Sequence, residues 1–198
     1  MTYLESAPLA RPRLKRNSFL RELVETVVLI ALVYTLVNLA TVRFYIEGPS
    51  MQPSFRAGQF LIVSRLHYLF GAPQRGDIVV FDPPGDEGRT DEPLLIKRLI
   101  GLPGERVEVR DGGVYINGEL LTESYINPTG VAQSCRGQYC DIVLGDNEYF
   151  LMGDNRNNSR DSRAFGPVER SRIVGEAIIR YWPLPDLGIV IQHRFSES

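Results

Sequence analysis

The sequence predicts a mainly β protein made of antiparallel β-sheet, with a small β-rich insertion, preceded by one N-terminal transmembrane helix. A single long apolar run lies near the N-terminus. Beyond it the apolar segments are short, turn residues separate them, and no window of about a dozen residues keeps a helical period. With 198 residues, of which 43% are hydrophobic, the chain can bury a substantial core.

The apolar run covers residues 23–42 and reads LVETVVLIALVYTLVNLATV. As a helix it would be about 30 Å long, which matches the hydrocarbon thickness of a bilayer. Basic residues crowd the tail, 1–22, and predict that it stays in the cytoplasm while everything after residue 42 lies on the other side. An uncleaved anchor is favoured over a cleaved signal peptide, because the run exceeds the roughly 7 to 15 residues of a signal-peptide core and Asn38 fits poorly at a cleavage site.

Short segments bounded by turn residues read as strands beyond the anchor. Their ranges are 44–47, 59–64, 77–82, 94–100, 106–110, 113–116, 148–152 and 172–181. Asp111-Gly112 and Asn117-Gly118 are typical of short hairpins. Because the chain becomes polar over 101–145, we expect an accessory β insertion there and a main catalytic β domain over 43–100 and 146–198. The acidic stretch 85–93 reads as a solvated loop.

The charges of the chain argue against a nucleic-acid partner. The net charge is -2, with 22 basic and 24 acidic residues, and the only concentrated basic run precedes the apolar segment. Lys15 and Lys97 are the only lysines, so every other basic residue is arginine. Since an arginine cannot be deprotonated in a protein, the lysine at position 97 suggests a chemical use.

The cysteines are Cys135 and Cys140, in the segment Cys-Arg-Gly-Gln-Tyr-Cys. No histidine lies near them in sequence, so a zinc site is not indicated. On the far side of a membrane a disulfide closing this short loop is the natural hypothesis. The alternative is a pair of unpaired surface thiols.

Lys97 lies in the apolar run LLIKRLI, and desolvation there would lower its pKa far enough for it to act as a general base. Strand alternation places Lys97 on one face with Leu95 and Leu99, and Arg98 on the opposite face. Ser50 follows Pro49, whose ring fixes its own φ, and offers both a nucleophilic hydroxyl and a backbone N–H for a developing oxyanion. It lies at most about 25 Å from the end of the anchor, so a membrane-tethered substrate fits best.

A Ser/His/Asp triad is the weaker proposal for the same chemistry. His67 and His193 are the only histidines. His67 lies beside aromatic residues and reads as a packing or surface residue, and His193 is close to the C-terminus, where chains often fray.

Several segments, in order along the chain, resemble the motifs of bacterial type I signal peptidase (leader peptidase), the membrane-anchored Ser/Lys serine protease family that removes signal peptides. They are GPSMQPS at 48–54, RGDIVVF at 75–81, LIKRLIGLPGE at 95–105, GDNRNNSRDSRAFGPV at 153–168, and GEAIIRYWP, which ends at Pro183. The resemblance covers roughly residues 20–183.

The resemblance implies that Ser50 is the nucleophile, that Lys97 is the general base, and that the Ser159 hydroxyl orients the lysine. It also implies that three residues near the site have structural roles: Asp154, Asp161 and Arg163. By the same resemblance, five residues occupy positions that line the small apolar pockets of the family: Phe44, Ile46, Phe55, Leu95 and Ile96. Neither a metal nor an organic cofactor is expected, and the basic residues within the last motif argue against a divalent cation.

The sequence departs from the family pattern at a few positions. Gly48 stands where some members carry a serine whose hydroxyl completes the oxyanion hole, so the hole would rest on the Ser50 N–H. Asn157 stands where an aspartate is frequent, and Ala164-Phe165 where bulkier aromatic residues occur. The departures at Asn157 and Ala164-Phe165 affect the expected local packing and leave the expected chemistry unchanged.

We therefore expect a serine endopeptidase that cleaves signal peptides from exported preproteins on the extracytoplasmic side, through an acyl-enzyme. The expected location is the plasma membrane or the thylakoid membrane, with the bilayer, preproteins and the protein translocation machinery as partners. The alternatives are a catalytically silent membrane-anchored binding module and a Ser/Lys peptidase of the same fold dedicated to one precursor. Cleavage of unrelated preproteins would separate them.

Overall fold

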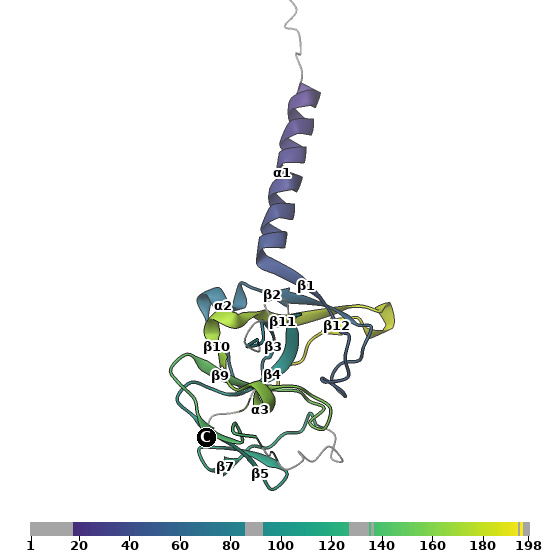
Figure 1. The fold of residues 1–198 in the computed structure, drawn as a ribbon. Coiled ribbons are helices and arrows are strands. Elements are labelled where there is room, and N and C mark those ends of the chain that lie inside the picture. Colours follow the sequence, from purple (N-terminus) through teal and green to yellow (C-terminus); the bar gives the residue numbers. More distant parts are fainter. Residues whose placement is uncertain (1–17, 86–92, 127–134, 136, 194, 196–198) are drawn as a thin grey trace, which may run out of the picture. The chain divides into compact units, whose positions relative to one another are not determined.

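The computed structural model describes residues 18–85, 93–126, 135, 137–193 and 195, and the chain divides into two units, 1–38 and 39–198. Helix α1, Ser18–Ala40, fills the described part of the first unit (Figure 1). Its segment Phe19–Ala40 has a mean hydropathy of 2.1, so by length and composition it can cross a membrane. The predicted span ran to residue 42, but Thr41 and Val42 pair with Ser64 and Val63 and so belong to the first strand.

An 8-stranded antiparallel sheet forms the main part of the second unit. Its strands follow the order β1-β2-β11-β3-β4-β9-β10, and β12 pairs with β11. Their bounds are β1 Thr41–Tyr45, β2 Phe60–Ser64, β3 Ile78–Phe81, β4 Leu95–Gly101, β9 Glu148–Met152, β10 Val168–Glu169, β11 Ile173–Trp182 and β12 Gly188–Ile189. The mainly antiparallel β fold predicted from the sequence is confirmed, because every pairing in the sheet is antiparallel.

A 4-stranded antiparallel sheet, in the order β7-β6-β5-β8, lies at the end of the unit away from β1 and β2 (Figure 1). Its strands are β5 Arg106–Arg110, β6 Gly113–Ile116, β7 Glu119–Leu120 and β8 Asp141–Val143. Asp111 and Asn117 have φ values of 51° and 52°, and each is followed by a glycine with positive φ. Two successive positive φ values are what a tight hairpin requires, so both predicted hairpins are present. The boundaries assigned to the accessory insertion, 101 and 145, stay a prediction.

Short helices complete the second unit: α2 His67–Phe70, α3 Ser162–Phe165, η1 Arg170–Arg172 and η2 Leu184–Asp186. The sequence did not predict them, because each is too short to show a helical period.

Gly101 joins the two sheets, since it ends β4 just before β5 begins. A Cβ at this position would lie 2.5 Å from Val107 Cγ2 and 2.8 Å from Leu144 Cδ1. The cluster around it combines residues of the main sheet, such as Phe150, with residues of the small sheet, such as Val107. The small sheet therefore packs directly on the main sheet rather than extending from it on a linker.

Candidate active site

Ser50 and Lys97 come together from segments far apart in the chain. Ser50 lies in the turn that follows β1, and Lys97 lies in β4. Lys97 Nζ donates hydrogen bonds to Ser50 Oγ and to Ile96 O, each at 2.9 Å. Only 2% of Lys97 is exposed. The buried amine of Lys97 is thus in hydrogen-bonding contact with the hydroxyl of the half-buried Ser50.

Burial of the Lys97 amine lowers its pKa from 10.5 to about 8, although the negative charges of Asp161 and Asp154 oppose the shift. The cause is desolvation, which disfavours the charged ammonium. A lysine with this pKa is partly neutral near neutral pH, and a neutral amine can accept a proton. Lys97 therefore has the protonation behaviour that a general base needs.

The loop 153–159 holds the backbone of the Ser50 turn. Asn155 N–H donates to Ser50 O at 2.9 Å, and Asn155 Nδ2 donates to Pro49 O at 3.2 Å. Within the described residues the Ser50 N–H makes no hydrogen bond, so it is available to donate one to a substrate oxygen. Sequence reasoning did not single out Asn155, because an asparagine in a loop rich in asparagine carries no distinguishing signal.

Gly153 packs against Ser50 and Ser159 so closely that no side chain would fit. A Cβ at Gly153 would overlap Ser159 Oγ and lie 2.5 Å from Ser50 O, distances that real Cβ atoms do not adopt. Gly153 N–H donates to Asp161 Oδ2 at 3.0 Å. Glycine is therefore required here by space rather than by backbone conformation.

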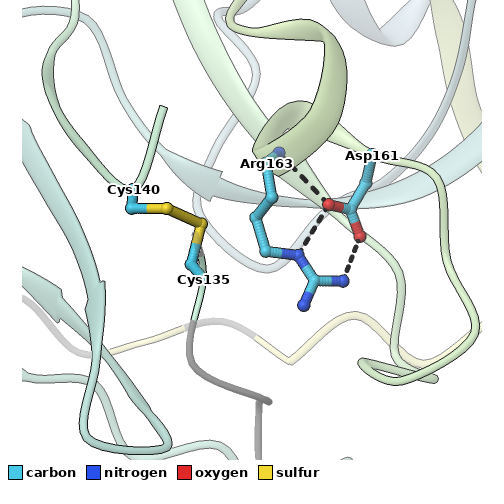
Figure 2. Close-up of a disulfide and its surroundings, with 4 residues drawn as sticks. All are labelled: Cys135, Cys140, Asp161 and Arg163. Atoms are coloured by element: carbon cyan, nitrogen blue, oxygen red, sulfur yellow. Dashed lines mark hydrogen bonds and ion pairs between the residues drawn. A yellow bond between two sulfur atoms is a disulfide. The ribbon is translucent and has the colours of Figure 1, made fainter. Parts of the chain in front are cut away.

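Asp161 and Arg163, which the resemblance places near the site as structural residues, form an ion pair (Figure 2). Arg163 Nε lies 2.8 Å from Asp161 Oδ1, and Arg163 Nη2 lies 2.8 Å from Asp161 Oδ2. Burial raises the pKa of the Asp161 carboxyl, but Arg163 and the Gly153 N–H outweigh it, so the pKa lies below its usual value. Asp161 therefore stays ionised and keeps its hold on Gly153.

Ser159 is in the expected neighbourhood but does not make the expected contact. Its hydroxyl is buried beside Gly153, and its interaction with the Asp161 carboxylate contributes to the lowered pKa of Asp161. Lys97 Nζ donates instead to Ser50 Oγ and to Ile96 O. The described hydrogen bonds of the Lys97 amine thus go to Ser50 and to the Ile96 carbonyl, and the orienting role expected of Ser159 stays a prediction.

Asp154 lies in a buried ion pair with Arg98, a residue that sequence reasoning left without a role. Arg98 Nε and Nη2 lie 2.9 Å and 2.7 Å from the two carboxylate oxygens of Asp154, and the two side chains are 1% and 0% exposed. Arg98 Nη1 also donates to Gly76 O, and Ser54 Oγ donates to Asp154 Oδ2. This pair joins β4 to the loop 153–159 right next to Lys97.

Four of the five residues expected to line apolar pockets lie in one cluster with the fully buried Met51: Phe44, Ile46, Phe55 and Ile96. The fifth, Leu95, packs in a different cluster, with Phe81 and Leu99. The reason is strand alternation, because successive residues of β4 point to opposite faces of the sheet. Met51 was not predicted, since nothing in the segment around Ser50 distinguishes it from a loop residue.

Cys135 and Cys140 form a disulfide, and the loop that it closes lies against the segment that carries Arg163 (Figure 2). A Cβ at Gly137, inside that loop, would lie 3.1 Å from Arg163 O.

Among the described residues no group of acidic, histidine or cysteine side chains could hold a metal ion. His67 instead lies 3.2 Å from Glu176, and the ring of His193 lies 5.3 Å from that of Tyr125.

The chain matches the family described as "Signal peptidase, peptidase S26" over residues 20–182. Signal peptidase I of Leptolyngbya laminosa is 42% identical over 149 residues, which are 73% of this chain and 70% of that protein. Probable signal peptidase I-2 of Synechocystis sp. is 38% identical over 155 residues, 78% and 69% of the two chains. Signal peptidase I of Bacillus licheniformis is 33% identical over 180 residues, 87% and 94% of the two chains.

The region that matches the family contains all the candidate residues described above, from Phe44 to Arg163. The matches to named relatives extend over most of this chain and over more than two thirds of each relative. The chain therefore belongs to the signal peptidase family, peptidase S26, and is a serine peptidase.

Proposed function

We propose that this chain is a membrane-anchored signal peptidase in which Ser50 is the nucleophile and Lys97 the general base. Cleavage of signal peptides by a serine peptidase is the activity of the family. The assignment of the two residues rests on one observation, the 2.9 Å contact between the buried Lys97 Nζ and Ser50 Oγ. Nucleophile and base within hydrogen-bond reach is the arrangement that nucleophilic catalysis requires.

The reaction then proceeds in two halves. Neutral Lys97 takes the proton of the Ser50 hydroxyl as Oγ attacks the scissile carbonyl. The tetrahedral adduct collapses, the protonated Lys97 gives its proton to the leaving amine, and an ester remains on Ser50. Lys97 next deprotonates a water, which attacks the ester and releases the carboxylic acid and the serine hydroxyl. The Ser50 N–H donates to the oxyanion in both halves.

The substrate binds as an extended strand beside β1, which is an edge strand of the main sheet. The apolar cluster described above combines residues close to Ser50 in sequence with Ile96, the neighbour of Lys97 in β4. It offers apolar side chains for the substrate residues before the cleaved bond. An apolar surface with little room accepts small side chains and excludes large ones.

Helix α1 anchors the enzyme, and the catalytic domain works on the extracytoplasmic side of the plasma or thylakoid membrane. This proposal is supported by the length and hydropathy of Phe19–Ala40 and by the basic residues of the tail before it. Preproteins held in the membrane by their own signal peptides would then meet the enzyme at the bilayer surface, where the translocation machinery releases them.

The decisive test is cleavage of a labelled preprotein in detergent by the full-length chain and by Ser50→Ala. The intact chain should release the mature protein, and Ser50→Ala should lose cleavage by about a thousandfold or more. Release of the mature protein by Ser50→Ala at an undiminished rate would show that the nucleophile lies elsewhere.

The rate should rise with pH. Lys97 accepts a proton only when neutral, so kcat/KM should increase through a midpoint at about pH 8 and then level off. Initial rates between about pH 6 and pH 10 measure this midpoint, with circular dichroism at each pH to confirm folding. A profile that falls through pH 8 would contradict the role of Lys97.

Gly153→Ala should lower kcat by about a hundredfold, because the new methyl group would displace Ser159 or the Ser50 backbone, and small misplacements are costly. The comparison is Gly188→Ala, since the nearest heavy atom to a Cβ at Gly188 is Asp186 O at 4.0 Å. Gly188→Ala should keep the original kcat. Equal rates for the two variants would contradict the steric argument.

A further inference from the structure

A buried ion pair ties the segment between β7 and β8 to the loop 153–159. Arg156 Nη1 donates to Glu123 Oε2 at 2.6 Å, and Arg156 Nη2 donates to Glu123 Oε1. The side chains of Arg156 and Glu123 are 1% and 5% exposed. A bidentate pair of this kind fixes the orientation of the guanidinium as well as its position.

The same guanidinium holds the carbonyl of Gly153. Arg156 Nε donates to Gly153 O at 3.1 Å, while the Gly153 N–H donates to Asp161. Gly153, which leaves no room for a side chain beside Ser50 and Ser159, is thus held from both sides. Asp161, paired with Arg163, holds its N–H, and Arg156, paired with Glu123, holds its carbonyl.

Glu123 is itself held in place by Tyr125. The Tyr125 hydroxyl donates to Glu123 Oε1 at 2.5 Å. The guanidinium of Arg98 lies over the Tyr125 ring, 3.9 Å from its centroid, and pairs with Asp154. The Arg98–Asp154 pair and the Arg156–Glu123 pair, which both reach the loop 153–159, therefore both contact Tyr125.

We propose that Glu123 is a positioning residue for catalysis, which acts through Arg156 on the Gly153 carbonyl and so on the loop that holds the Ser50 backbone. The inference rests on the proposed roles of Ser50 and Lys97. Glu123 touches no reacting atom. Its charge is needed because a neutral side chain would leave the buried guanidinium of Arg156 uncompensated and free to turn away from Gly153 O.

The test compares Glu123→Gln with the full-length wild type in detergent, using one preprotein substrate and correcting for the folded fraction. We expect kcat to fall by about tenfold to a hundredfold, with KM little changed, because the apolar substrate cluster is untouched. The pH midpoint of kcat/KM should also move upward, since a looser loop lets water reach the Lys97 amine. Glu123→Asp keeps the charge and should recover part of kcat.

The matched control is Asp141→Asn, which removes the ion pair between Asp141 and Arg106 in the small sheet. These two side chains are 54% and 52% exposed. Asp141→Asn should keep the kcat and the pH midpoint of the wild type. If the wild type itself does not cleave, the proposed function fails. If the wild type cleaves and folded Glu123→Gln matches it in kcat and pH midpoint, the role of Glu123 is refuted.

A second variant keeps the test decisive if Glu123→Gln does not fold. Arg156→Lys keeps a positive charge beside Glu123 but removes the Nε donor to Gly153 O. We expect folded Arg156→Lys to lose kcat by about tenfold. Undiminished kcat would refute the link from Glu123 through Arg156 to Gly153.

Discussion

Replacement of Lys97 by arginine or by methionine should reduce kcat by about a thousandfold or more while leaving the fold intact. Arginine keeps the positive charge but cannot accept a proton, and methionine keeps the apolar stem but has no amine. Because burial disfavours the charged amine of Lys97, Lys97→Met should be at least as stable as the wild type at neutral pH. The measurements are preprotein cleavage and thermal unfolding followed by circular dichroism.

The two variants control for each other. Lys97→Arg places a permanent charge in a buried site and is the one expected to lose stability, whereas Lys97→Met removes that charge. Loss of cleavage in folded Lys97→Met would therefore report on chemistry alone. Substantial cleavage by Lys97→Met would mean that another group takes the proton of Ser50.

Arg98→Met should lower the free energy of unfolding by about 3 to 5 kcal/mol, because it leaves the buried charge of Asp154 without its partner. The Gly76 carbonyl also loses its donor. Urea unfolding measures the change. Arg98→Met combined with Asp154→Asn removes the uncompensated charge and should recover much of the lost stability.

Arg106→Gln is the matched control for this prediction. It breaks an ion pair with Asp141 of similar length, but both side chains are more than half exposed. Exposed pairs contribute little, so the unfolding midpoint should hardly move. A similar loss of stability in Arg98→Met and Arg106→Gln would show that burial is not what makes the Arg98 pair important.

The strands were predictable where local pattern alone decides them. Strands β5, β6 and β9 have the bounds expected from the sequence, because alternation and turn residues mark both of their ends. Strands β7, β8, β10 and β12 are only two or three residues long and were not predicted. Such pieces become strands because a neighbouring strand supplies their hydrogen bonds, which a single sequence does not reveal.

The contact of Ser50 with Lys97 was expected from the motifs, but the ion pairs around it were not. Arg98 and Asp154 are far apart in sequence, as are Glu123 and Arg156, and each is a common residue type among many similar ones. An arginine in a sequence is normally exposed. Only the fold shows that these two arginines are buried and which carboxylates they meet.

Strand β1 begins directly after the apolar helix, which bears on whether the protease can cleave its own chain at that point. Thr41–Tyr45 pairs residue by residue with β2, and Ala40 O accepts a hydrogen bond from Arg65 N–H. A peptide bond must be presented on a free extended segment to be cut. The peptide bonds that follow the enzyme's own helix already belong to its sheet, so we expect the folded enzyme to resist cleavage there by another copy of itself.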